Sequence, residues 1–128
     1  MNAEVIRQVV AETQTGNLIF PEVVRRLLEV GVESYLIDLA TGNETFYMTD
    51  GSAHTEIMTL PLAAIAEDFS ATGIVAAIRG AQADTVRYPE FVKLSRAAGV
   101  TAYWAFLTGK KVIYFGRKGE MHIEEFPK

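Results

Sequence analysis

Two short His-x-Glu segments are the strongest candidates for metal binding or acid–base catalysis in this 128-residue chain. His54 is followed two residues later by Glu56, and His122 by Glu124, and the chain has no other histidine. On a strand, alternation places both side chains of a pair on one face, about 7 Å apart. If the pairs converged, two imidazoles and two carboxylates would suit a divalent metal such as Zn²⁺, iron or manganese. Alternatively, one glutamate would act as a general base oriented by its histidine.

The same pairs also have a simpler interpretation. Each follows a turn glycine by two or three residues, at the end of a structural unit, where exposed polar residues are common. We therefore favour a solvated or structural role over a metal-dependent enzyme, and we expect no cofactor. The chain has no cysteine, which excludes thiolate catalysis and cysteine-based metal sites. It also lacks a phosphate-binding loop and the sequence context of a serine nucleophile.

The two pairs belong to an internal repeat that organises the whole chain. Residues 3–60 align with residues 71–128 at a constant offset of 68, without a gap. We infer that one supersecondary unit was duplicated and that its copies pack about a pseudo-twofold axis. The identical positions include Pro21/Pro89, Glu22/Glu90, Gly31/Gly99, Tyr35/Tyr103, Leu39/Leu107, Gly51/Gly119, His54/His122 and Glu56/Glu124.

Each repeat is expected to hold two helices followed by three short strands. Val5, Ile6 and Val9 fall on one side of a helix, and Pro21 and Glu22 suit the first turn of a second. Residues with strand propensity follow, separated by turns that contain glycine. The expected strands are 33–39, 45–48 and 53–57 in the first repeat, and 101–107, 112–115 and 121–125 in the second. These elements predict an α+β fold, an antiparallel sheet of about six strands with helices packed mainly on one face.

We expect residues 1–128 to form a single domain. The segment that joins the repeats, 61–70, is too apolar for a solvated linker and is expected to pack on the core. Apolar residues make up 49% of the chain and charged residues 22%, as in ordinary globular proteins. The net charge of −4 and the absence of a basic run argue against nucleic acid as a partner. With no apolar stretch of membrane-spanning length and no recognisable secretory signal, we expect a soluble, cytoplasmic protein.

The central strand of the second repeat predicts an aromatic surface. If helices cover the face that carries Tyr35 and Tyr103, then Trp104 and Phe106 lie on the opposite face. Such a patch is normally covered by another group. The candidates are a second subunit, the segment 59–68 of the same chain, or a small molecule. We favour a homodimer, whose interface would be self-complementary about a twofold axis.

Binding is accordingly the favoured function, at a homodimer interface or with a small apolar ligand in the groove between the repeats. Asp38 is polar where the second repeat has an aromatic residue, and it is more readily explained as a hydrogen-bond acceptor than as a catalyst. The candidate contacts are Trp104, Phe106, Tyr47, Tyr114 and Asp38.

Several short segments, spread over nearly the whole chain, carry a family resemblance. They are Phe20-Pro21-Glu22-Val23, Gly31-Val32, Tyr88-Pro89-Glu90-Phe91, Ala98-Gly99-Val100 and Val112-Ile113-Tyr114-Phe115-Gly116-Arg117. Together they resemble the YbcV-like bacterial family of unknown function, whose members are often labelled "phage envelope protein". The resemblance implies a self-contained domain and brings no activity, cofactor or catalytic residue. It adds a third hypothesis, a phage or prophage accessory protein that binds another protein.

Overall fold

The computed structural model describes residues 2–127, which form four helices and one six-stranded antiparallel sheet. This is the α+β fold that the sequence predicts. Residues 1 and 128, the ends of the expected domain, lie outside the described residues. The helices are α1 (Ala3–Gln14), α2 (Phe20–Glu29), α3 (Ala71–Gln82) and α4 (Tyr88–Ala97). The strands are β1 (Val32–Asp38), β2 (Asn43–Met48), β3 (Ala53–Ile57), β4 (Val100–Phe106), β5 (Lys111–Gly116) and β6 (Met121–Glu125).

The two halves of the chain share one sheet, with strand order β3-β2-β1-β4-β5-β6. Each element of the first half recurs 68 residues later with the same length. The halves join through β1 and β4, where Leu36 lies opposite Trp104. This register maps onto itself at the 68-residue offset, as expected for a pseudo-twofold arrangement. A duplication as its origin stays a prediction from the sequence.

The helices begin where local chemistry favours it. Asn2 caps α1, because its side-chain oxygen accepts a hydrogen bond from the Val5 N–H at 3.3 Å. Ser70 caps α3 in the same way, accepting from the Gly73 N–H at 2.9 Å. The helices α2 and α4 have no such cap but carry proline in their first turn, where a missing N–H costs no hydrogen bond.

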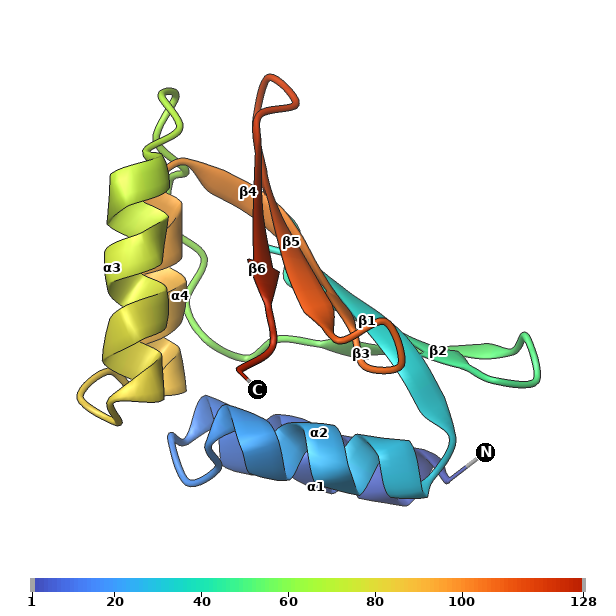
Figure 1. Ribbon diagram of the computed structural model, residues 1–128. Coiled ribbons are helices and arrows are strands. Elements are labelled where there is room, and N and C mark those ends of the chain that lie inside the picture. Colours follow the sequence, from blue (N-terminus) through green and yellow to red (C-terminus); the bar gives the residue numbers. More distant parts are fainter. Residues whose placement is uncertain (1, 128) are drawn as a thin grey trace.

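Both pairs of helices cover the same face of the twisted sheet (Figure 1). We call this the inner face; it carries Tyr35 and Ile37 of β1 and Tyr103 and Ala105 of β4, all buried. The outer face carries the alternate residues of the same strands, and Leu36, Asp38, Trp104 and Phe106 there are half-buried. The core therefore lies between the inner face and the helices, as the sequence predicts. Its fully buried side chains include Ile6, Leu27, Ile74 and Val92.

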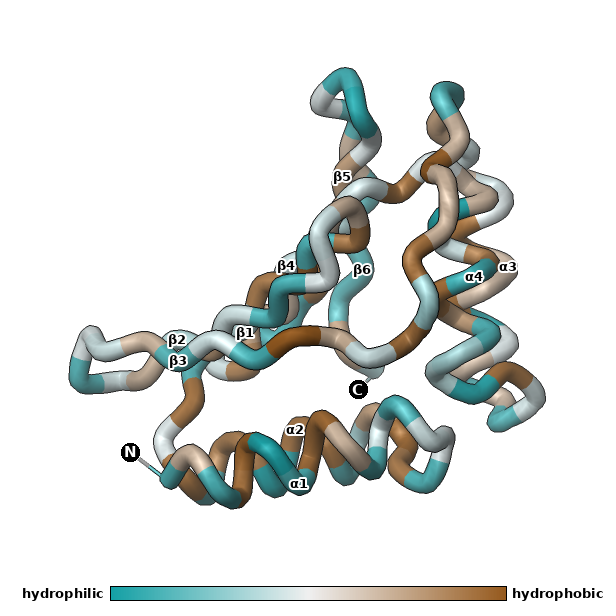
Figure 2. Tube along the Cα trace, turned by 180° about the vertical axis from the view of Figure 1, so that it is seen from behind, coloured by the Kyte–Doolittle hydropathy of each residue, from teal (hydrophilic) through white to brown (hydrophobic). Residues whose placement is uncertain are grey.

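The joining segment runs from the end of β3 to α3 and has apolar residues along its length (Figure 2). Its side chains Leu60, Ile65 and Phe69 pack against the core. Arg96 of α4, only 3% exposed, donates hydrogen bonds to the carbonyl oxygens of Leu39 (3.3 Å) and Pro61 (3.0 Å). The Pro61 contact, together with a backbone hydrogen bond from the Ala66 N–H to the Arg96 carbonyl oxygen (3.0 Å), places the segment beside α4.

Gly99 ends α4 and provides a test of this packing. Its φ is +82°, and a Cβ there would overlap the carbonyl oxygen of Asp68 in the joining segment. Gly119 has nearly the same φ, +85°, but faces open space. The left-handed conformation costs an alanine about 1–2 kcal/mol at either position, and only Gly99 adds a clash.

We therefore expect Gly99→Ala to lower the free energy of unfolding by more than Gly119→Ala does. Urea unfolding of the two variants measures the difference. Equal losses would contradict the close approach of the joining segment to α4.

Candidate functional site

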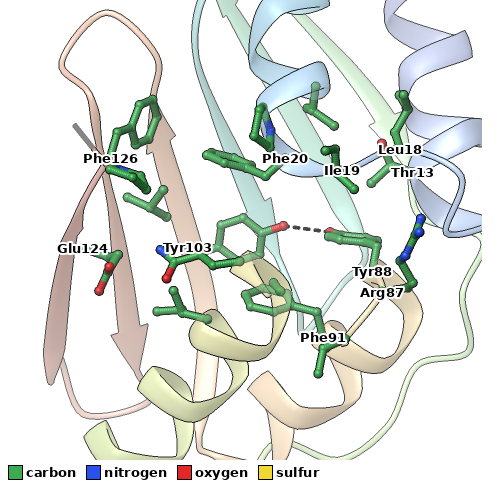
Figure 3. Close-up of a pocket in the computed structure, with 18 of the residues that line it drawn as sticks. Thr13, Leu18, Ile19, Phe20, Arg87, Tyr88, Phe91, Tyr103, Glu124 and Phe126 are labelled. Atoms are coloured by element: carbon green, nitrogen blue, oxygen red, sulfur yellow. Dashed lines mark hydrogen bonds between the residues drawn. The ribbon is translucent and has the colours of Figure 1, made fainter. Parts of the chain in front are cut away.

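A cavity of about 330 Å³ lies between the two pairs of helices, above the inner face of the sheet (Figure 3). Tyr35, Tyr103, Val112 and Tyr114 contribute to it from three strands. The start of α2, the end of α3 and the start of α4 form its walls. The wall side chains are mainly apolar, among them Leu18, Ile19, Phe20, Ile78, Ala81 and Phe91. Its volume and lining are those of a small-molecule site.

The opening of the cavity is bordered by apolar side chains that water can reach. Ile19 is 41% exposed and Phe20 is 37% exposed. The Phe20 ring packs edge-on against Phe126, with ring centroids 5.3 Å apart, so the end of the chain forms part of the border. Exposed apolar groups around a concave opening are typical of a binding site.

Two tyrosine hydroxyls meet inside the cavity. The Tyr88 and Tyr103 oxygens are 2.8 Å apart, and Figure 3 marks the hydrogen bond between them. Burial raises the pKa of both side chains above the ordinary range, so both stay neutral. One hydroxyl proton is used between them, which leaves the other free to donate to a further group.

A buried carboxyl adjoins this tyrosine pair. A smaller space of about 30 Å³ shares Tyr35, Tyr88 and Tyr103 with the main cavity and is bounded by Glu44 of β2. Glu44 is 4% exposed, and no donor among the described residues reaches its buried Oε2. Burial raises the pKa of Glu44 to about 7, and the negative charge of Glu56 on the neighbouring strand acts in the same direction.

The sequence analysis missed Glu44, although two signals for it were present. The strand alternates, so Glu44 shares a face with Phe46, a buried residue. Its counterpart at the 68-residue offset is Val112, which is apolar and buried. A carboxyl at an inward-facing position whose counterpart is valine is costly to bury, and such a position indicates a site.

The two His-x-Glu pairs do not converge. They lie on β3 and β6, which are the opposite edges of the sheet, with four strands between them. Within residues 2–127, no three His, Cys, Asp or Glu side chains are grouped so that they could hold a metal ion. The geometric condition for a shared metal or catalytic site of His54, Glu56, His122 and Glu124 is therefore not met.

Each pair instead connects a sheet edge to a helix through arginine. Glu124 accepts hydrogen bonds from Arg79 of α3 at 2.7 Å and interacts with His122 at 3.1 Å. Burial alone would raise the pKa of Glu124, but Arg79 and His122 outweigh it and hold the pKa below its ordinary value. At the other edge Glu56 pairs with His54, and Arg7 of α1 lies 3.6 Å from Glu56. Both arrangements are ion-pair networks.

The structure separates the predicted binding residues. Trp104, Phe106 and Tyr47 form a cluster on the outer face, with ring centroids 5.2 Å apart for Trp104 and Phe106 and 5.6 Å apart for Trp104 and Tyr47. Tyr114 lies on the inner face and lines the cavity. Asp38 accepts hydrogen bonds from two backbone N–H groups of the following turn, at 2.9 and 3.1 Å, so its interpretation as an acceptor is confirmed.

Residues 8–125 match the family described as "Protein of unknown function (DUF1398)", and the chain belongs to this family. Comparison with curated proteins gives no match. The narrower YbcV-like grouping and its phage label stay predictions from the sequence. Among the described helices, none has both the length and the apolar character needed to cross a membrane.

The buried carboxyl makes stability depend on pH. Because the pKa of Glu44 is about 7 in the folded protein and 4.5 ordinarily, the folded state binds more protons between these values. The free energy of unfolding is therefore highest below about pH 4.5 and falls as the pH rises through about 7. For Glu44 alone, this decrease is roughly 3 kcal/mol. We expect Glu44→Gln to remove this loss.

Urea unfolding at several pH values between about 4.5 and 7.5 measures the loss. The matched control is Glu125→Gln, which changes an exposed carboxyl and should keep the wild-type dependence. A Glu44→Gln variant with the wild-type pH dependence would show that Glu44 is not buried as described.

Proposed function

We propose that this protein is a non-catalytic domain that binds a small apolar or aromatic molecule in the cavity between its two pairs of helices. The observation that carries this proposal is the cavity itself, about 330 Å³ and lined by aromatic and aliphatic side chains. Its polar groups, which include tyrosine hydroxyls and charged side chains at the rim, can orient a ligand.

The position of the cavity supports binding over simple imperfect packing. Residues from both halves of the chain line it, so a ligand there would contact β1, β4 and both pairs of helices. Aromatic rings with few rotatable bonds form much of its floor. Little side-chain entropy is lost when a ligand orders such rings.

Filling the cavity tests this function. Ala81 lines it at the end of α3, whereas Ala76 of the same helix is exposed to solvent. We expect N-phenyl-1-naphthylamine, a neutral fluorophore, to bind the wild type saturably. Ala81→Phe should weaken this binding at least tenfold because the ring occupies the space, and Ala76→Phe should leave it unchanged.

Fluorescence titration measures the affinity of the wild type and the two variants for the fluorophore, and circular dichroism establishes that each protein is folded. The proposal fails if the wild type does not bind the probe. It also fails if Ala81→Phe binds as well as the wild type does.

A specific observation favours a second function, homodimerisation through the outer face. Leu36, Trp104, Ile113 and Ile123 pair directly across β1, β4, β5 and β6 and form an uncharged apolar row. Ile123 is 52% exposed, and Met121, further along β6, is 58% exposed. A row of this kind suits a partner with the same surface, as a twofold dimer provides.

Sedimentation tests the dimer. Trp104→Arg places a charge in the centre of the row and should shift the protein from dimer to monomer, because a buried unpaired charge is costly. Ala76→Arg adds the same charge on the exposed side of α3 and should leave the dimer intact. An unchanged sedimentation profile for Trp104→Arg would rule the outer face out as the interface.

A further inference from the structure

We propose that the molecule bound in the cavity is a primary amine with an apolar body, whose ammonium group binds Glu44. This inference rests on the proposed binding function and names the ligand class. Glu44 is the reason, because it is a buried carboxyl with an unpartnered oxygen at one end of an otherwise apolar space.

The surroundings of Glu44 suit a cation. Rings from β1, β2, α4 and β4 line the small space beside it, and its volume of about 30 Å³ holds one group of the size of water or ammonium. Aromatic rings attract cations through their negative faces. The tyrosine hydroxyls there can accept the remaining ammonium protons. The rings are Tyr35, Phe46, Tyr88 and Tyr103.

The charges near Glu44 select the head group. Glu56 lies opposite Glu44 on β3, and Glu56 already pairs with His54 and Arg7. Around the small space, α1 and α2 contribute only valine and threonine, and the titratable side chains of β1, α4 and β4 are the neutral tyrosines. Glu44 therefore has no cationic partner among the described residues. A ligand carboxylate would add a second uncompensated charge, whereas an ammonium neutralises one.

The rim of the main cavity also favours a cationic ligand over an anionic one. Asp84, Glu124, Glu125 and Arg87 lie at the rim, and Glu124 is already paired with Arg79 of α3 at 2.7 Å. Arg87 is already engaged, 2.8 Å from Asp84 and donating to the carbonyl oxygen of Gly16 at 2.6 Å. With Asp84 and Glu124 paired, the negative charge of Glu125 is the one left to attract a cation towards the opening.

The repeat supplies the orientation of the ligand. At the 68-residue offset, Glu44 corresponds to Val112, which lines the main cavity. Equivalent positions of the two halves thus hold a carboxyl on β2 and a valine on β5. The ammonium group of the ligand lies at Glu44, and its apolar body lies against Val112, Ile78 and Phe91.

Two probes that differ only in the head group test this inference. We would measure the binding of 2-phenylethylamine and of 2-phenylethanol by calorimetry, with the wild type, Glu44→Gln and Glu4→Gln. The wild type should bind the amine at least tenfold more tightly than the alcohol. Glu44→Gln should lose this preference and keep its affinity for the alcohol, which also shows that the variant is folded. Glu4→Gln removes an exposed carboxylate of α1 that lines neither space, and it should keep the preference.

The failure of this inference is separate from the failure of the proposed function. Equal affinity of the wild type for both probes, or an amine preference that survives in Glu44→Gln, overturns the amine inference and leaves the cavity as a binding site. The inference is also overturned if neither probe binds the wild type. In that case the titration with N-phenyl-1-naphthylamine decides the proposed function, which fails if the wild type does not bind this fluorophore or if Ala81→Phe binds it equally well.

Discussion

The antiparallel pairing of β1 with β4 is the interaction on which the rest of the structure depends. It makes one sheet of the two halves, with Leu36 opposite Trp104. Each of these strands directly follows its own pair of helices, so the pairing also fixes where the two pairs stand. The pairs diverge over the inner face (Figure 1), and the cavity lies between them beside Tyr35 and Tyr103. The same pairing brings the apolar residues of the outer face into one row.

We infer that the proposed ligand contact at Glu44 arises from a departure from the symmetry of the two halves. The backbone frame repeats at 68 residues, yet Glu44 stands where the other half has Val112. This one difference gives a largely apolar cavity a polar end. It also costs stability near neutral pH, since the carboxyl ionises without a partner. A group kept at a cost to folding is more readily explained by binding than by packing.

Local patterns in the sequence predicted the elements because their signals are local. Proline in a first turn, glycine after a helix and alternation in strands act within a few residues, and the strand bounds agree to within two residues. The join between the halves was not predictable, because a register between strands far apart leaves no local pattern. Alternation, a local signal, correctly put His54 and Glu56 on one face. The distance between this pair and His122 and Glu124 depends on the strand order, which the sequence does not show locally. Tyr114 was named from sequence and lines the cavity, whereas Glu44 was overlooked.

The central claim is that the inner-face cavity, and not the outer face, is the ligand site. The most direct test is an NMR titration of labelled protein with 2-phenylethylamine. Ile78 and Val112 methyl groups report on the cavity, and the indole N–H of Trp104, the single tryptophan, reports on the outer face. We expect saturable shifts of the two methyl signals with the indole signal unmoved. Movement of the Trp104 signal with unchanged Ile78 and Val112 would contradict it.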